Sequence, residues 1–426
     1  MLFVATLTRG RVETEKYVNV DSAVADVSTA RLDARTRRQV SLDVFRGLTV
    51  AAMILVTDPG TYDAVYPQLL HAPWNGATAT DMIFPSFLFI VGVAITLSLS
   101  SRIARGDDRR KIAGRALVRS VLLFGFGLIM TAFPDFDLHT MRPMGIFQRI
   151  AVCYLCGSLL YLGTAGQSQA GEADHRAGRV ALFSGIIVCI LAGYWALLKL
   201  VPVPGVGAGH LDSFGNLPAY LDRRIIGVSH MWIYGVTAGM GVTYDPEGIL
   251  STLPALSNVL FGMLAGEWMR TRRSGPQKAA VLAAAGLALV LAGWFLHPML
   301  PLNKKIWTST FALFSTGVAM MVYALLYTIV DLWRSRWWTP PAMIFGTNAM
   351  LAFALSGVLT TLGNRHLSVP HGGGTSVISI RNSVYRHCFA SWLAPVHASL
   401  AYAIAVVVLD MLLIYPLYRK RIFLKL

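Results

Sequence analysis

The sequence predicts an all-α fold, a polytopic integral membrane protein with about ten transmembrane helices. Of its 426 residues, 55% are hydrophobic and only 14% are charged, whereas a soluble domain carries about 25% charged residues. The mean hydropathy is +0.55. Apolar windows of about 17–25 residues, the length needed to cross a bilayer core, recur along the whole chain.

Ten windows are expected to span the membrane: 42–57, 82–100, 112–133, 144–164, 180–201, 250–269, 279–297, 308–331, 342–362 and 394–418. The first gives the weakest signal, because it is short and carries Asp43 and Arg46. Residues 1–40 are polar and basic, which predicts a flexible cytoplasmic tail before a membrane domain at 41–426. Segment 228–245 is semi-apolar and glycine-rich, so we expect an interfacial or re-entrant piece there.

The distribution of positive charge predicts the orientation. With the N-terminus inside, the inner loops and both chain ends hold 25 Lys and Arg, and the outer loops hold eight. Since Lys and Arg collect on the cytoplasmic side, we expect both termini in the cytoplasm and an even number of spans. The net charge of +15 is then mostly a topology signal. The basic residues are dispersed over the inner loops, which argues against a nucleic-acid partner.

Two sequence features predict absences. Leu2 to Leu7 is too short for the apolar core of a signal peptide, and an arginine follows it, so no cleavable signal is expected. Cys153 and Cys156 lie in an apolar window without a second pair, and Cys388 stands alone outside. We therefore expect neither a disulfide framework nor a metal site.

Asp43 and Arg46 are three residues apart at the inner end of the first window, so they share a helix face and can pair. One interpretation is a pair that anchors the helix at the membrane surface. The other is a cation that receives an anionic cofactor from the cytoplasm.

His71 begins the outer stretch His71-Ala72-Pro73-Trp74-Asn75-Gly76. A neutral imidazole can take a proton from an ammonium or hydroxyl nucleophile, and it can accept an acyl group itself. The alternative is a loop histidine bonded to a backbone carbonyl. Thr80 or Asp81 could cap the helix that follows, because an acid suits a helix N-terminus.

Two more outer clusters are candidates for binding. Asp245 and Glu247 could bind the ammonium group of a substrate, or they could be acids at a helix start. Lys304 and Lys305 lie on the outer side, although Lys and Arg collect on the cytoplasmic side. This suggests a functional role for them, and the alternative is that they anchor the chain at the membrane interface. The remaining polar candidates are Arg142, Gln148, Arg149 and Asn348.

Four stretches together resemble the heparan-alpha-glucosaminide N-acetyltransferase catalytic family: 41–48, 71–76 followed by Asp81-Met82-Ile83-Phe84-Pro85, 244–248 and 303–308. The resemblance covers about 41–415. The His-Ala-x-Trp-Asn-Gly block with the following Asp and Phe-Pro is specific. The Leu-Asp-x-x-Arg-Gly block is looser, since it also resembles the opening of other membrane acyltransferases.

The resemblance implies an acyltransferase that moves an acetyl group from cytoplasmic acetyl-CoA to an amino sugar on the far side of the membrane. It implies that His71 is the catalytic histidine, either acetylated or acting only as a base. On this hypothesis Asp81 or Asn75 assists His71, and Arg46 with Asp43 lies near the phosphates of acetyl-CoA. The residues expected to bind the acceptor are Trp74, Asp245, Glu247, Asn303 and Lys304.

The sequence departs from the family at Thr57, where related sequences usually have Asn. An Asn amide can donate to a developing oxyanion, and a Thr hydroxyl can do so with shorter reach. The extended N-terminal portion of the lysosomal member of this family is also missing, so we expect a bacterial inner-membrane homologue surrounded by lipid. The resemblance further implies a homodimer.

Two other hypotheses stay open. One is a transporter or flippase of a sugar conjugate, with His71 and Arg149 as a proton relay. The other is a membrane scaffold without turnover.

Overall fold

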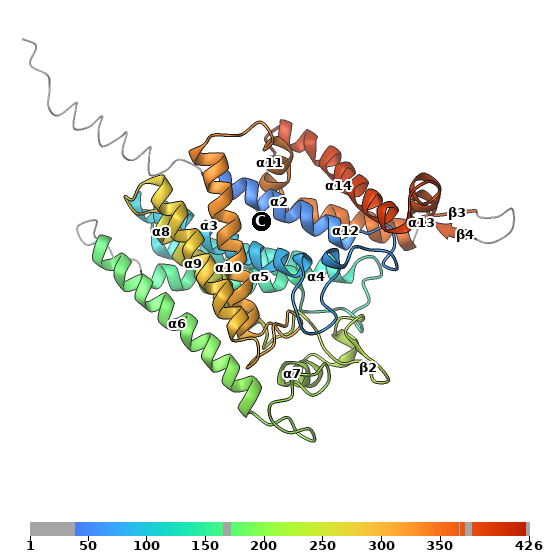
Figure 1. Ribbon diagram of the computed structural model, residues 1–426, viewed down its shortest axis with the longest axis horizontal. Helices are drawn as coiled ribbons and strands as arrows, with labels where there is room; N and C mark the ends of the chain where they lie inside the picture. Colours follow the sequence, from blue (N-terminus) through green and yellow to red (C-terminus); the bar gives the residue numbers. More distant parts are fainter. Residues whose placement is uncertain (1–38, 165–171, 366, 371–376, 423–426) are drawn as a thin grey trace, which may run out of the picture. The chain divides into compact units, whose positions relative to one another are not determined.

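The computed structural model describes residues 39–164, 172–365, 367–370 and 377–422 (Figure 1). The predicted tail at 1–40 therefore lies outside the described residues, apart from its last two. The all-α fold class is confirmed. Within the described residues, strands occur in two short hairpins, β1 (Val236–Thr237) with β2 (Gly241–Val242) and β3 (Ser368–Pro370) with β4 (Val377–Ser379).

The long helices follow the predicted windows. They are α2 (Val40–Thr57), α3 (Ala79–Ala104), α4 (Arg109–Ala132), α5 (Ile146–Gly163), α6 (Glu172–Leu200), α8 (Thr252–Met269), α9 (Gly275–Phe295), α10 (Ser309–Leu326) and α14 (Pro395–Arg419). Shorter helices are α7 (Leu217–Ile225), α11 (Pro340–Thr347), α12 (Ala349–Arg365) and α13 (Ile380–Tyr385). Turns of 3-10 helix lie at Pro67–Leu69 and Val228–His230, and π-helical turns at Tyr327–Leu332 and Arg386–Ala390.

The number of spans differs slightly from the prediction. By length and composition, eight helices of the described chain can cross a membrane, or nine if α11 and α12 form one broken span. These two helices meet at 87° around Asn348, so the predicted window 342–362 is not one straight helix. The window 250–269 forms α8, which carries Asn258 and Glu267 and is not among the helices apolar enough to be counted. The first window, which gave the weakest signal, forms α2, and α2 is long and apolar enough to cross a membrane.

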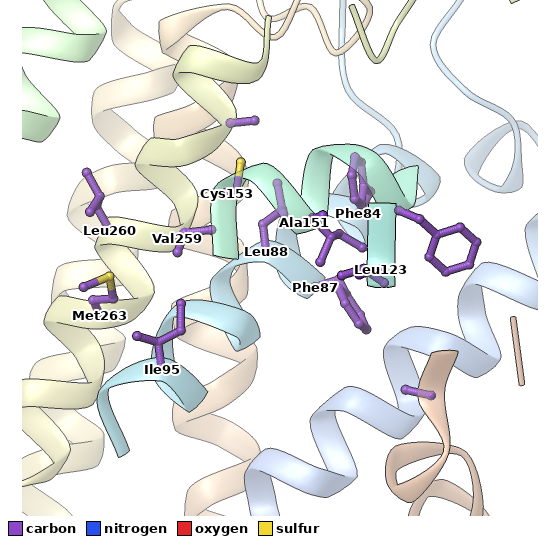
Figure 2. Packing of buried hydrophobic residues seen from close by; sticks show 14 of the residues in the cluster. Phe84, Phe87, Leu88, Ile95, Leu123, Ala151, Cys153, Val259, Leu260 and Met263 are labelled. Carbon is purple, nitrogen blue, oxygen red and sulfur yellow. The ribbon is translucent and has the colours of Figure 1, made fainter. Parts of the chain in front are cut away.

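Helices α3 and α8 pack closely because two glycines lie between them. A Cβ at Gly92 would stand 1.9 Å from the carbonyl oxygen of Val259, and one at Gly262 would stand 2.1 Å from that of Phe89. Small residues allow such backbone contact between membrane helices. Around this contact lies the main hydrophobic cluster, to which α3, α4, α5 and α8 all contribute (Figure 2).

The segments between the long helices carry most of the polar candidates. The segment 228–245 contains a 3-10 turn and the β1–β2 hairpin in place of a spanning helix, as the sequence predicted. The loops 58–78 and 296–308 are joined where the Gly76 N–H donates to the Leu302 carbonyl at 2.7 Å. This contact brings two loops that are far apart in the sequence side by side.

Candidate active site

The first turn of α3 fixes the position of Asp81. Thr78 is the N-cap residue, and its backbone N–H donates to Asp81 Oδ2 at 3.0 Å in a capping box. The sequence placed the cap at Thr80 or Asp81. The N-cap residue is Thr78 instead, and Asp81, the third residue of the helix, completes the capping box with its side chain. Asp81 is fully buried, so its carboxylate has little freedom to turn away.

The second oxygen of the same carboxylate binds His71. Asp81 Oδ1 lies 2.7 Å from His71 Nδ1, and Oδ2 also accepts the Ala72 N–H at 3.1 Å. Because a carboxylate only accepts hydrogen bonds, Nδ1 carries the imidazole proton and Nε2 keeps its lone pair. The His71 side chain is 40% exposed. The arrangement therefore offers an oriented base that a substrate can reach.

Lys304 lies directly beside this imidazole. Its Nζ is 3.2 Å from both ring nitrogens of His71 and 4.0 Å from Asp81 Oδ1. Since Nδ1 already donates to Asp81, the ammonium can donate only to Nε2. Only 12% of the Lys304 side chain is exposed.

The protonation of this pair follows from its surroundings. Partial burial, together with the Lys304 ammonium, outweighs the Asp81 hydrogen bond and lowers the pKa of His71 below 6.5, so the imidazole is neutral at pH 7. Burial lowers the pKa of Lys304 to about 8, although Asp81 and Glu247 oppose the shift. Near neutral pH the site therefore holds a neutral base beside an amine that loses its proton easily.

Asn75 and Asn303 join the two loops that carry His71 and Lys304. The Asn303 amide donates to Asn75 Oδ1 at 3.2 Å, while its own Oδ1 accepts the Ile306 N–H at 3.1 Å. Asn303 is 1% exposed and Asn75 is exposed. The buried Asn303 amide thus fixes the loop, and the exposed Asn75 lies on the same loop as His71.

Trp74 fixes the other side of the histidine loop. Its indole N–H donates to the Leu211 carbonyl at 2.8 Å, and its ring meets that of Tyr244 edge-on with centroids 5.0 Å apart. The contact with Tyr244 brings the segment 244–248 beside the histidine loop.

Asp245 and Glu247 share Arg142. The Arg142 Nε donates to Asp245 Oδ2 at 2.7 Å, and its Nη2 donates to Glu247 Oε2 at 2.6 Å and to Asp245 Oδ1. Burial alone would raise the pKa of Glu247, but Arg142 lowers it overall, so the carboxylate is charged. Helix α8 starts at Thr252 without an acid in its first turn. The helix-start alternative for these two acids is therefore wrong.

Arg149 and Asp222 lie beneath the segment 244–248. Arg149 is fully buried and donates from Nη2 to the Gly248 carbonyl at 3.2 Å and to Ser251. Asp222 accepts the Ile249 N–H at 2.9 Å, and burial raises its pKa to about 7. Sequence reasoning missed Asp222, because its only signal is one acid in the short helix α7.

The predicted donor-side pair lies elsewhere on the chain. Arg46 Nη1 is 3.2 Å from Asp43 Oδ1, and it also donates to the Gly346 carbonyl at 3.3 Å. Eleven residues of α2 separate Arg46 from Thr57, roughly 16 Å at 1.5 Å per residue. The Thr57 hydroxyl donates to the Met53 carbonyl of its own helix at 2.9 Å. The structure therefore forms the predicted pair, at the opposite end of α2 from the histidine loop.

No group of three or more His, Cys, Asp or Glu suited to a metal ion occurs among the described residues. All four cysteines are unpaired, and Cys153 is buried in the core between the helices (Figure 2).

Comparisons with known proteins bear on this arrangement. A family model described as "Heparan-alpha-glucosaminide N-acetyltransferase, catalytic" matches residues 38–171, which include Arg46, His71 and Asp81. The human heparan-alpha-glucosaminide N-acetyltransferase is 28% identical over 386 residues, which cover 80% of this chain and 57% of that protein. The mouse protein of the same name is 28% identical over 383 residues, covering 80% and 58%.

The chain thus spans less than two thirds of the length of these curated relatives. The match includes the block around His71 on which the sequence resemblance was based. The resemblance of this chain to the heparan-alpha-glucosaminide N-acetyltransferase catalytic family is therefore confirmed.

Proposed function

We propose that the chain is a membrane-bound acetyltransferase that moves an acetyl group from acetyl-CoA to the amine of a glucosamine-like sugar. One observation carries the proposal: the buried carboxylate of Asp81 orients His71 so that Nε2 is an unprotonated, accessible base. Such a pair suits acylation of an amine, which must lose a proton as it attacks a thioester.

In the proposed reaction, the acceptor nitrogen attacks the thioester carbonyl, the new C–N bond forms and the C–S bond breaks. His71 Nε2 takes the proton from the nitrogen and passes it to the departing thiolate, so that CoA leaves as its thiol. Asp81 stabilises the imidazolium that results and holds the reactive tautomer. A route through an acetylated His71 would use the same nitrogen atom as nucleophile.

The proposed acceptor site lies around the base. Asn75 and the half-buried Trp74 lie on the histidine loop, and Asn303 and Lys304 face them from the loop before α10. Asp245 and Glu247 form a charged wall that Arg142 holds in place. An aromatic ring beside fixed polar groups is typical of a site for a small polar ligand.

The proposed donor site lies at the other end of α2. Acetyl-CoA would approach from the cytoplasm, with its phosphates near the Asp43–Arg46 pair and basic residues of the inner loops. The excess of Lys and Arg on those loops supports this orientation, with both termini inside. We place the protein in a bacterial inner membrane, among lipids, and propose a homodimer as its assembly.

A transfer assay tests the proposal. Purified protein in detergent is incubated with radiolabelled acetyl-CoA and glucosamine, and labelled product and released CoA are measured. We expect wild-type protein to form acetylglucosamine and the His71→Gln variant to lose at least about 100-fold in rate. The matched control is His210→Gln, since His210 is similarly exposed, at 45% against 40% for His71, and lies 3.7 Å from a carboxylate, Asp212. Equal rates for wild type and His71→Gln would overturn the proposal.

The same assay distinguishes the transport hypothesis from the acetyltransferase hypothesis. A transporter or flippase with a relay between His71 and Arg149 would move a sugar conjugate without releasing CoA. Arg149 donates to Gly248 and Ser251, and within the described residues no hydrogen bond joins it to His71. Stoichiometric release of CoA with product formation would favour the transferase.

A further inference from the structure

One amine of the protein itself stands where an acceptor amine would have to stand. To be deprotonated by His71, an attacking nitrogen must come within hydrogen-bond reach of Nε2, about 2.6–3.2 Å. Lys304 Nζ lies 3.2 Å from that atom. Its distance of 4.0 Å from Asp81 Oδ1 also provides the nearby carboxylate that an ammonium group favours.

The side chain is held in this place. Lys304 is 12% exposed and lies 4.0 Å from Asp81 Oδ1, and the charges of Asp81 and Glu247 both act on its ammonium. Its loop is fixed where the neighbouring Asn303 bonds to Asn75 and where the Leu302 carbonyl accepts the Gly76 N–H. The ammonium therefore has few other positions to occupy.

The amine is also reactive enough to acylate. With a pKa of about 8, about one tenth of Lys304 is unprotonated at pH 7, against less than about a thousandth for an ordinary lysine. An unprotonated amine beside a base is the nucleophile that the proposed reaction needs.

We propose that Lys304 is a self-acetylation site, which the protein modifies with its own acetyl donor when no acceptor is bound. This inference rests on the proposed function. Nζ attacks the thioester carbonyl, the C–N bond forms, the C–S bond breaks, and CoA leaves as its thiol. The proton from Nζ passes to His71 Nε2 and from there to the departing thiolate.

The consequence is a self-limiting enzyme. The acetyl-lysine amide is stable and uncharged, so it would occupy the acceptor position and end turnover. An amino sugar that displaces Lys304 from His71 would protect the protein. Donor without acceptor should therefore inactivate the protein, and donor with excess acceptor should not.

Lys305 provides an internal control. It is the next residue in the chain, and burial lowers its pKa too. Its ammonium stands 5.4 Å over the ring of Trp232, and no hydrogen bond to His71 is found within the described residues. Chemical acetylation by acetyl-CoA alone would label both lysines, whereas transfer assisted by His71 should select Lys304.

The test incubates the full chain in detergent with isotope-labelled acetyl-CoA at pH 8, without acceptor, and maps acetyl-lysine by peptide mass spectrometry. We expect at least about tenfold more label on Lys304 than on Lys305. We also expect its loss in folded His71→Gln protein and its suppression by glucosamine. In the Lys304→Arg variant, preincubation with donor should cause no time-dependent loss of whatever transfer activity it has.

Three results would overturn the inference. They are equal labelling of both lysines, labelling that survives His71→Gln, and an unlabelled Lys304 in protein that acetylates glucosamine. The last result would leave the proposed function standing. If neither glucosamine nor Lys304 received acetyl from protein that is folded, both proposals would fall together.

Discussion

Asp81 binds His71 with one carboxylate oxygen, at 2.7 Å, and caps its own helix with the other. The two bonds make the orientation of the imidazole depend on the first turn of α3. A base held by a buried carboxylate in this way is preorganised before any substrate arrives.

The first prediction concerns this carboxylate. Asp81→Asn keeps the shape and one acceptor oxygen, but it cannot satisfy Thr78, Ala72 and His71 as a carboxylate does. We expect the kcat for acetyl transfer to fall by about 10²–10⁴, measured as the initial rate of labelled product. Asp63→Asn is the control, because Asp63 is an exposed acid of the loop that carries His71. A rate for Asp81→Asn within a factor of two of the control would contradict the assignment.

The second prediction concerns pH. His71 must be unprotonated to act as a base, so kcat/KM should fall as the pH drops through the His71 pKa, which lies below 6.5. The Lys304 ammonium lowers that pKa. In Lys304→Met the acidic limb should therefore move to higher pH.

Both pH profiles should be measured with the same acceptor, so that the titration of the acceptor amine cancels in the comparison. If the acidic limb of the Lys304→Met profile stayed at the same pH as in wild type, the Lys304 ammonium would not act on His71.

The third prediction concerns stability. Arg142 forms ion pairs with both Asp245 and Glu247, whose side chains are 0% and 9% exposed. Arg142→Met would leave two buried carboxylates without the guanidinium that binds both, a loss of about 3–5 kcal/mol in the free energy of unfolding. Arg365→Met removes an exposed pair with Asp135 and should cost at most about 1 kcal/mol. Thermal unfolding in detergent compares the two; equal midpoints would contradict the account of this cluster.

The fourth prediction concerns the contact between α3 and α8. A methyl group at position 262 would stand 2.1 Å from the Phe89 carbonyl oxygen, so Gly262→Ala must push the helices apart. We expect it to destabilise the fold by about 1–3 kcal/mol. Gly185→Ala in α6 meets nothing within 4 Å and should be neutral or slightly stabilising. A midpoint for Gly262→Ala at or above that of Gly185→Ala would show that the backbones are not in contact.

Composition and the length of the apolar windows predicted the helices, because crossing a bilayer demands long apolar windows whatever the tertiary contacts. They also predicted the local pair of Asp43 and Arg46, which one helical turn brings together. The break at Asn348 could not be predicted, since Asn348 lies inside a single apolar window, 342–362. The polar contacts of α8 could not be predicted either. Asn258 of this helix bonds within the bundle to Thr316 and Trp307, which lie far from it in the sequence.

The candidate site was predicted as residues and not as an arrangement. His71 stood out as an imidazole in an outer loop, and Asp81 as an acid at the start of the following helix. The contact between His71 and Lys304 joins positions 233 residues apart, which no local pattern encodes. Likewise, nothing in the sequence assigned Arg142 to Asp245 and Glu247, although each was a candidate by itself.

The measurement that tests the central claim most directly uses proteoliposomes of uniform orientation, with labelled acetyl-CoA on the side of the termini and glucosamine on the other. The account predicts acetylglucosamine on the glucosamine side, CoA on the donor side, and loss of both in His71→Gln vesicles. Product that appears only when donor and acceptor share one side would contradict transfer across the membrane. Sugar movement without any release of CoA would contradict the acetyltransferase itself.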